Sequence, residues 1–456
     1  MEREDRQTVV VIGAGATGLA ASYILRRAGV NVVMVEGAAQ AGGLLKTFEV
    51  GNGHRLEFFY HHFFTHDAEI IWLLHELGLG ERLVFRPTTM GIFHGGRVYP
   101  FNGPKDLMKF RAISILPRLR FGLSSALLTY WTAYAKRDYH SAIGWFRRWA
   151  GHHATEAIWR PMLEIKFGDA ANRITLAWMA GRMRQRIRSR RLGEETLGYL
   201  DGSLQVLIDR LVEELDKRGV KIYLGSYVQR LIIENGRISG VATNNGPVHG
   251  DKVLSTIATP ILAKLVRPIS DAYADQLESV QYTGVISTIF NMPRQLSPVY
   301  WLNVADPGYD FGGVIEQTNF VGPEHYGRRH LVYLSRYIDT DHPLWTMGDK
   351  KVVDRQVRQL ERLFGRHLKS SVDQSWVFRG RFAGPIWDIG FHRRIPTFKS
   401  PIPNLYVASM SHVYPDERSV NNSIRVAAEA TRALGVTTAA DLVPHGCSLA
   451  GTYGAD

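Results

Sequence analysis

The sequence has one cysteine and no long apolar run, and both shortages exclude classes of protein. Cys447 is the only cysteine among 456 residues, so the chain forms no internal disulfide and no cysteine-based metal site. This composition suits a reducing compartment. The first seven residues, MEREDRQ, carry charges of both signs, so we expect no secretory signal peptide. The charge-free stretch Phe121–Ala135 has 15 residues, whereas a transmembrane helix needs roughly 20. We predict a cytoplasmic protein that does not span a membrane.

Catalytic side chains in a familiar arrangement are also missing. No Ser-His-Asp set, cluster of metal ligands or pair of carboxylates stands out, so we predict no metal site. Such an absence fits a protein whose cofactor carries the chemistry while the chain aligns the reacting groups.

Positive charge, in contrast, is abundant. The 55 Lys and Arg residues exceed the 43 Asp and Glu residues, which gives a net charge of +12 and favours anionic partners. Basic residues are dense in Arg182–Arg191 and in Lys109–Arg120, and each cluster is either a solvated helix face or a binding surface. No RNA- or DNA-binding signature accompanies them, so we expect no nucleic-acid partner.

The stretch Phe121–Ala135 has two interpretations. Its apolar residues suit a buried helix in a substrate-binding region. Its aromatic residues and flanking Arg and Lys residues equally suit a helix at a membrane surface, so the sequence leaves open a peripheral association at the inner face of a membrane.

The strongest pattern is Val9–Glu36. An apolar run is followed by G-x-G-x-x-G, a helical pattern and a second apolar run that ends on Glu36, 18 residues after Gly18. This order of strand, glycine turn, helix and parallel strand is the dinucleotide-binding fingerprint. We expect the pyrophosphate at the helix N-terminus and the ribose hydroxyls at Glu36. The residues concerned are Gly13, Gly15, Ala16, Thr17, Gly18 and Glu36.

Two further segments resemble the FAD fingerprint of the protoporphyrinogen oxidase/amine oxidase superfamily. The first is Gly42-Gly43-Leu44, just after Glu36. The second is a strand at 403–409, a loop containing Ser411 and a helix that opens at Asn421-Asn422-Ser423. The chain is most similar to the bacterial protoporphyrinogen-oxidase-like group, which is related to UDP-galactopyranose mutase.

This resemblance implies FAD as the cofactor. It implies that the N–H groups at 421–423 form the capping turn of a helix that meets the flavin, and that Ser411 lies in the adjoining loop. It also implies that Val228 contacts adenine through its backbone.

The resemblance implies an α/β fold, in which a Rossmann-like FAD-binding domain of the GR2 type carries an inserted α+β substrate domain. We assign residues 1–95, 198–260 and 385–436 to a discontinuous FAD-binding domain. Residues 96–197 and 261–384 form the substrate domain, with a helical part and a sheet part, and 437–456 form a tail.

Five residues are weak candidates for positions beside the flavin. His61 and His62 lie in an aromatic stretch where relatives often carry a histidine or glycine near the flavin. Lys166 is a candidate because amine oxidases often place a lysine near flavin N5, and Arg336 and Tyr337 lie at the end of a predicted strand. Ordinary alternatives are core histidines, a surface lysine and a solvent-facing arginine, and the sequence favours the surface for Lys166 and Arg336.

Three functions fit the resemblance. The first is an FAD-dependent oxidoreductase that oxidises or desaturates a substrate by hydride transfer to flavin N5. The second is a non-redox, flavin-dependent sugar mutase, which the Tyr99–Asn102 segment and the many arginines favour, although a mutase-like Thr-Arg followed by Glu-x-Lys is missing. The third is a prenyl-lipid-binding escort protein without catalysis, against which the intact FAD fingerprint argues.

The substrate class stays open at this point. The basic clusters suggest a small molecule with a phosphate, such as a sugar nucleotide, and the apolar helical region suggests an isoprenoid-like one. The sequence leaves open the electron acceptor and the oligomeric state.

Overall fold

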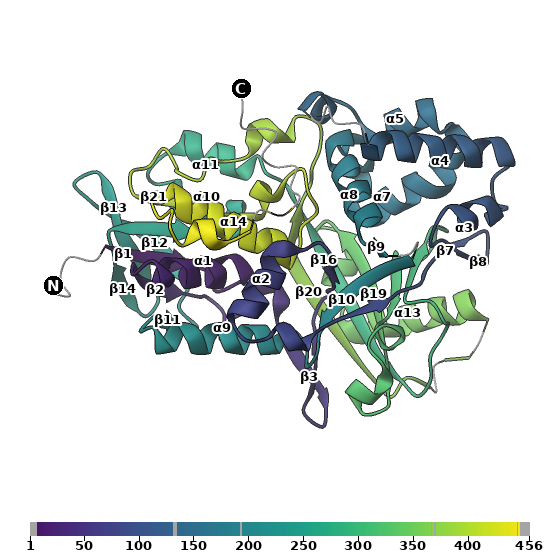
Figure 1. The fold of residues 1–456 in the computed structure, drawn as a ribbon, viewed down its shortest axis with the longest axis horizontal. Helices are drawn as coiled ribbons and strands as arrows, with labels where there is room; N and C mark the ends of the chain where they lie inside the picture. The colour runs from purple at the N-terminus through teal and green to yellow at the C-terminus, as the bar shows by residue number, and fades with distance from the viewer. Residues whose placement is uncertain are drawn as a thin grey trace.

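The computed structural model contains three units (Figure 1). A parallel sheet covered by helices lies at the left of Figure 1, a group of helices lies at the upper right, and a large mixed sheet lies beneath that group. The structure describes residues 7–130, 135–191, 194–365, 367–368, 371–444 and 446.

The parallel sheet has five strands in the order β11-β2-β1-β15-β21. Its first βαβ unit is the predicted one, since β1 spans Thr8–Ile12, α1 spans Ala16–Arg27 and β2 spans Asn31–Val35. The other strands come from distant parts of the chain: β11 (Lys221–Tyr223), β15 (Lys252–Ser255) and β21 (Leu405–Val407).

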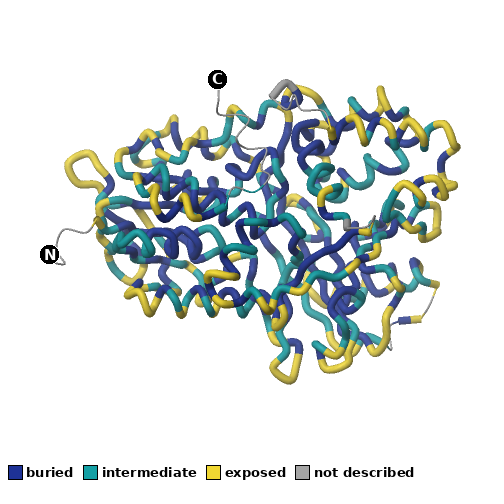
Figure 2. The backbone as a smooth tube through the Cα atoms, viewed as in Figure 1, coloured by how far each residue is buried: buried dark blue, intermediate teal, exposed yellow. Residues whose placement is uncertain are grey.

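Both faces of this sheet are buried, as expected of parallel strands (Figure 2). Val9 and Val11 point to one side, where they pack with α1, α2 (Ala68–Glu76), α9 (Gln205–Lys217) and α14 (Val420–Ala433). Val10 and Ile12 point to the other side and pack against a three-stranded sheet and two helices. These elements are β12 (Val228–Glu234), β13 (Arg237–Thr243), β14 (Gly246–His249), α10 (Thr259–Val266) and α11 (Asp271–Glu278).

The large mixed sheet has seven strands in the order β20-β16-β19-β18-β17-β7-β8. Their bounds are β20 (Gln374–Pro385), β16 (Tyr282–Met292), β19 (His330–Ile338), β18 (Gly313–Glu316), β17 (Trp301–Val304), β7 (Met90–His94) and β8 (Arg97–Pro100). Helix α13 (Asp349–Phe364) packs on it through Val357 and Leu360, and α12 (Pro343–Thr346) precedes α13. The predicted boundary between residues 95 and 96 falls within the β7–β8 hairpin, and the division into domains stays a prediction.

The helical unit packs around Phe146, Trp178 and Trp387, all fully buried. Its helices are α3 (Pro104–Lys109), α4 (Ile115–Tyr130), α5 (Ala142–Trp149), α6 (His152–Ala154), α7 (Arg160–Phe167) and α8 (Leu176–Arg188). No helix in the described part of the chain has both the length and the apolar character needed to cross a membrane.

Short strands connect these units. Strand β10 pairs with β5, β6 and β9, and β3 pairs with β4. Their bounds are β3 (Thr47–Gly51), β4 (His54–Glu57), β5 (Phe63–Phe64), β6 (Leu83–Pro87), β9 (Arg190–Arg191) and β10 (Glu194–Leu200). Residue Glu57 at the end of β4 is buried and accepts hydrogen bonds from Tyr199 and from the N–H of Leu204, and so joins β10 to the start of α9.

Candidate active site

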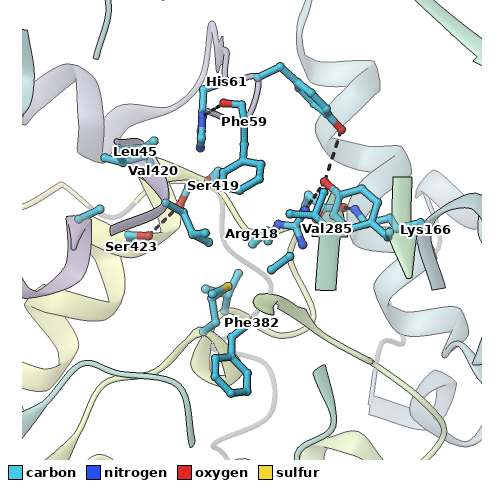
Figure 3. A pocket seen from close by; sticks show the side chains of 18 of the residues that line it. Leu45, Phe59, His61, Lys166, Val285, Phe382, Arg418, Ser419, Val420 and Ser423 are labelled. Atoms are coloured by element: carbon cyan, nitrogen blue, oxygen red, sulfur yellow. Dashed lines mark hydrogen bonds and ion pairs between the residues drawn. The ribbon is translucent and has the colours of Figure 1, made fainter. Parts of the chain in front are cut away.

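A cavity of about 510 Å³ lies where the carboxyl ends of β1, β2 and β15 face the large sheet and the helical unit (Figure 3). This is the usual position of a ligand in an open α/β sheet. The nucleotide-fold side of the cavity is formed by Gly13, Gly15, Ala16, Thr17, Gly18, Glu36, Gly42, Gly43, Leu44 and Thr256. Every residue of the first glycine fingerprint and of the Gly-Gly-Leu segment that the sequence predicts therefore lines one wall.

The glycines of this wall serve different purposes. A Cβ on Gly18 would lie 1.9 Å from the carbonyl oxygen of Gly13, so glycine is needed there for α1 to pack on the turn after β1. Gly43 has a φ of +57°, and a Cβ on it would lie 3.1 Å from Cα of Gly15. Gly15 itself has an ordinary φ of −80°, and its Cβ would meet only Cα of Gly43, at 3.8 Å. The protein around Gly15 does not require glycine, which fits a bulky ligand held against this backbone.

Glu36 closes the same wall at the end of β2. Its carboxylate accepts hydrogen bonds from the N–H groups of Ala14 (2.7 Å) and Ala38 (2.8 Å), which fix both oxygens at the cavity. Because each carboxylate oxygen accepts more than one hydrogen bond, ribose hydroxyls still find acceptors there. The N-terminus of α1 has no side-chain cap and no acidic residue in its first turn, which suits an anionic pyrophosphate.

The N-terminus of α14 borders the cavity through Ser419, Val420 and Ser423. Ser419 is the N-cap, since its hydroxyl accepts from the N–H of Asn422 at 3.1 Å. The prediction that 421–423 form the capping turn is therefore wrong by a few residues. The hydroxyl of Ser423 turns back to the carbonyl of Ser419, at the left of Figure 3.

Four predicted cofactor-binding residues lie outside the lining of the cavity. The side chain of Asn421 bonds Glu69 (2.7 Å) and the N–H of Ile70, and so ties α14 to α2. The Asn422 side chain donates to the carbonyl of Glu417 at 2.6 Å. Ser411 is fully buried beside Ser409, and Val228 opens β12 opposite Thr243. Their roles toward a cofactor stay predictions.

His61 and His62 lie at the cavity and are neutral. Nδ1 of His61 donates to the carbonyl of Phe59 at 2.6 Å, and burial lowers the His61 pKa to about 4. For His62, burial and the charge of Arg186 lower the pKa to about 3. Its Nδ1 is buried and bonds no protein atom in the described residues.

The wall opposite the glycines carries a cluster of charges around Glu417, just before α14. One oxygen of Glu417 accepts from Lys166 on α7 and from Arg182 on α8, the latter at 2.8 Å. Lys166 Nζ also lies 5.0 Å from the centre of the Trp178 ring, a cation–π contact. The prediction of a surface lysine is therefore wrong. Lys166 contacts the carboxylate of Glu417, which is distant in the sequence, and the Trp178 ring, and only 14% of its side chain is exposed.

The neighbouring Arg418 completes this cluster. It donates to the Tyr337 hydroxyl, its guanidinium lies 4.7 Å above the Tyr337 ring, and Tyr60 lies 3.5 Å from the same hydroxyl. No carboxylate is paired with Arg418 among the residues the structure describes. Arg336, next to Tyr337 on β19, points away from the cavity and donates to the carbonyl of Tyr309 at 2.6 Å. It is half-buried rather than solvent-facing.

The charges in the cluster shift each other's ionisation. Burial would raise the pKa of the Glu417 carboxyl, but Lys166, Arg182 and Arg418 outweigh burial and lower it to about 2. Burial lowers the pKa of Lys166 well below its ordinary value, and the two arginines add to this effect while Glu417 opposes it. The carboxylate is thus ionised, and the cluster carries more positive than negative charge.

No group of three or more His, Cys, Asp or Glu side chains in the described ranges is arranged to hold a metal ion. The chemical features of the cavity fit FAD: a backbone cradle open at Gly15, an acid at the end of β2 and the N-termini of two helices, α1 and α14. Residues 16–430 match the family described as flavin containing amine oxidoreductase. The chain belongs to this family. It is an FAD-dependent oxidoreductase.

Two curated relatives of this flavoenzyme share about a quarter of its residues or fewer. Coproporphyrinogen III oxidase of Staphylococcus aureus is 24% identical over 327 residues, which cover 68% of this chain and 66% of that protein. Coproporphyrinogen III oxidase of Bacillus subtilis is 21% identical over 441 residues, covering 88% of this chain and 92% of that one.

Solved structures share the fold of the flavoenzyme. The putative protoporphyrinogen oxidase of an Exiguobacterium species superposes with a TM-score of 0.75 at 20% identity, covering 94% of this chain and 98% of that chain. Reduced UDP-galactopyranose mutase superposes with a TM-score of 0.74 at 16% identity, covering 98% of each chain. The predicted resemblance, the FAD-binding α/β fold and the cofactor are confirmed.

Sequence reasoning missed the residues that give the flavoenzyme its charged wall. Glu417 and Arg418 lie in the loop before α14, which was treated only as a connection to the flavin helix. Arg182 was noted as part of a basic cluster without a partner. The sequence does contain one pattern that indicates this wall: Arg182 and Arg186 are four residues apart, which puts both on one face of α8. Arg186 bonds Glu195 at 2.9 Å on that face.

Proposed function

We propose that the flavoenzyme oxidises or desaturates a small molecule that combines an anionic group with an apolar body. Bound FAD supplies the redox chemistry, accepting a hydride at N5 from a C–H or C–N centre. The chain's own residues bind the substrate, exclude water and hold the reacting carbon in place.

The observation that carries the proposal is the unbalanced charge opposite the glycine wall. The guanidinium groups of Arg182 and Arg418 stay charged beside the single carboxylate of Glu417, which also accepts from Lys166, so the two arginines alone exceed the negative charge. A carboxylate or phosphate of the substrate would balance this excess, and the guanidinium groups offer further N–H donors for it.

The remaining walls support an apolar body. They include Phe59, Trp159, Val285 and Phe382, and Figure 3 shows the Phe59 and Phe382 rings on opposite sides of the cavity. Large rings of this kind exclude water from the reacting carbon. Neutral His61 and His62, on the same side as Phe59, would hydrogen-bond polar groups of the ligand without adding charge.

The first compound to test is coproporphyrinogen III, because two of the curated relatives are named for its oxidation and because it joins carboxylates to an apolar macrocycle. Holoenzyme and substrate are mixed without oxygen, and the visible absorbance of the flavin is followed. We expect bleaching by the acid and little bleaching by its methyl esters, which lack the negative charges. Equal bleaching by both compounds, or none by either, would contradict the proposed substrate class.

The charged wall is tested by Arg182→Gln. We expect the KM for an anionic substrate to rise about ten- to a hundredfold, the range for losing one charge-assisted hydrogen bond, while bound flavin is retained. The matched control is Arg188→Gln on the exposed face of the same helix, which should leave KM unchanged.

A mutase remains the second candidate, because the fold is shared with UDP-galactopyranose mutase. The two are separated by the redox state of the flavin. A mutase requires pre-reduced flavin and leaves it reduced, whereas the proposed oxidase is reduced by its own substrate. An escort protein would take up no FAD.

For location, we propose peripheral association at the inner face of a membrane. The net charge of +12 and the basic residues at 105–120 and 147–148 support an anionic surface as partner.

A further inference from the structure

The outer face of α4 is apolar and uncovered. Its exposed apolar side chains recur every three or four residues and form what we call the α4 stripe: Ile115 (52% exposed), Leu116 (64%), Leu119 (53%), Leu123 (72%), Leu127 (40%) and Tyr130 (72%). At 3.6 residues per turn these six positions fall within about 120° of the helix circumference. Scattered apolar residues are ordinary on a protein surface, but a continuous stripe of this kind marks an interaction site.

The inner face of α4 is firmly packed, so the stripe belongs to an ordered helix. Phe121 and Leu128 are buried in the core of the helical unit. The Phe121 ring stacks on Trp159 at 5.3 Å between ring centres, and Trp159 lines the cavity. The helix therefore presents one face to solvent while its other face lies one side chain from the active site.

Basic residues border the stripe. Arg120, at its edge, donates to the backbone carbonyls of Arg148 and Trp149, which brings the end of α5 alongside α4. Arg118 donates to the carbonyl of Ile113, which holds the preceding loop against the first turn of α4. Helix α3, this loop and the end of α5 carry the exposed residues Lys105, Lys109, Arg111, Arg147 and Arg148, of which Arg147 is paired with Glu156.

Acidic residues are scarce in the same region. Only Asp106 and Asp138 occur between positions 104 and 153. Asp138 is fully buried and bonds His392, and Asp106 bonds the backbone and side chain of Asn102. The surface around the α4 stripe is therefore positive as well as apolar.

We propose that the α4 stripe docks on the surface of an anionic lipid bilayer, with α4 lying in the plane of the membrane. An apolar helix face bordered by Lys and Arg satisfies both requirements of such a surface, since leucines enter the acyl boundary while the cations meet the headgroups. A second copy of the chain would fit less well, because a symmetric contact would bring the basic borders together.

This inference rests on the peripheral membrane association proposed as part of the function. It also implies how the cavity is oriented relative to the bilayer. Helices α7 and α8 line the cavity with Lys166 and Arg182, and they pack in the same helical unit as α4. In Figure 1, α4 lies at the end of the molecule away from the parallel sheet. Docking would therefore place the substrate side near the bilayer and the nucleotide fold away from it.

The test is sedimentation of the full-length holoenzyme with vesicles of phosphatidylcholine alone or mixed with phosphatidylglycerol. We expect binding to the mixed vesicles that weakens with salt. Leu116→Gln/Leu123→Gln should lower the affinity at least about tenfold, because these are the two most exposed leucines of the stripe. Arg111→Gln/Arg148→Gln should lower it by about fivefold for each charge removed.

The control is Leu224→Gln/Ile233→Gln, which changes two exposed apolar residues on the nucleotide-fold side (43% and 45% exposed, against 64% and 72% for Leu116 and Leu123). It should bind vesicles as the unmodified enzyme does. Unchanged binding by the stripe variant, absence of binding to anionic vesicles, or a concentration-dependent dimer that only the stripe variant abolishes would each overturn the proposal. Anaerobic flavin reduction in detergent-free solution is measured in parallel, so failure of docking is distinguished from failure of the oxidase assignment.

Discussion

We infer that glycine is required at position 15 by the ligand that binds against its backbone, and not by the protein around it. Its dihedral angles are open to any residue and its neighbours leave room for a Cβ, unlike those of Gly18. The difference separates a glycine that serves the ligand from one that serves the fold. A sequence pattern contains both and cannot tell them apart.

Gly15→Val should therefore remove FAD without unfolding the chain. The branched side chain occupies the space that the pyrophosphate needs at the N-terminus of α1. We expect a colourless protein with an unchanged far-ultraviolet circular dichroism spectrum. Gly18→Ala, in contrast, should lose secondary structure, because its Cβ meets the Gly13 carbonyl. A yellow Gly15→Val protein would show that the pyrophosphate lies elsewhere.

Glu417 is the single negative charge among buried cations. Glu417→Gln keeps an acceptor oxygen but removes the negative charge that Lys166 and Arg182 share, and breaking a buried ion pair in this way costs about 3–5 kcal/mol. We expect that loss in the free energy of unfolding, measured with urea. Glu213→Gln removes a carboxylate that also pairs with two cations, Arg210 and Lys217, but at the surface, and should leave stability unchanged. A buried variant as stable as the surface one would contradict the charge assignment.

Two elements converge on the flavin side of the cavity, α1 and α14, and the caps of their N-termini differ. The start of α1 is bare, whereas Ser419 caps α14 and also lines the cavity. The Ser419 hydroxyl thus stabilises the helix and leaves the other N–H groups of the first turn for an acceptor.

Ser419→Ala should lower stability by about 1 kcal/mol and weaken FAD retention. Ser270 is the N-cap of α11, far from the cavity, and its hydroxyl accepts from Tyr273 in the same way. Ser270→Ala should cost a similar amount of stability and leave FAD retention unchanged. Comparing flavin content after dialysis with the urea midpoint of each variant checks both expectations, and equal flavin content in the two would contradict the role of α14.

The elements themselves were largely predictable from sequence, and the substrate wall was not. Local patterns of period and glycine predicted β1, α1 and β2, and the resemblance predicted β21 and α14, all close to their observed bounds. The charged wall depends on contacts between residues far apart in the chain: Lys166 and Arg182 meet Glu417 across 251 and 235 positions. No local pattern records such a contact, which is why Lys166 was expected at the surface.

At the scale of the whole molecule, buried neutral histidines make the fold sensitive to acid. The pKa of His412 is lowered by burial from 6.5 to about 4 in the folded chain. Above pH 6.5, His412 therefore does not reduce the free energy of unfolding. As the pH falls from 6.5 toward 4, the unfolded chain binds the proton first and the free energy of unfolding decreases. Asp67, whose pKa burial raises to about 7, acts in the opposite direction.

His412→Gln isolates the contribution of one histidine. Between pH 6.5 and 4, the free energy of unfolding of this variant should depend on pH less steeply than that of the unmodified chain, by about 1.4 kcal/mol per pH unit. The exposed His249→Gln should retain the original slope. Parallel slopes for all three proteins would show that folding does not lower the pKa of His412.

The strand order of the parallel sheet has a consequence for synthesis. β15 holds β1 on one edge and β21 on the other, and α1 packs on α14, so the first and last elements are neighbours separated by about 400 positions. A nascent chain that has emerged only as far as the helical unit still lacks β11, β15, β21 and α14. The cofactor compartment therefore cannot close during translation, and the newly made enzyme meets FAD only after nearly the whole chain has left the ribosome.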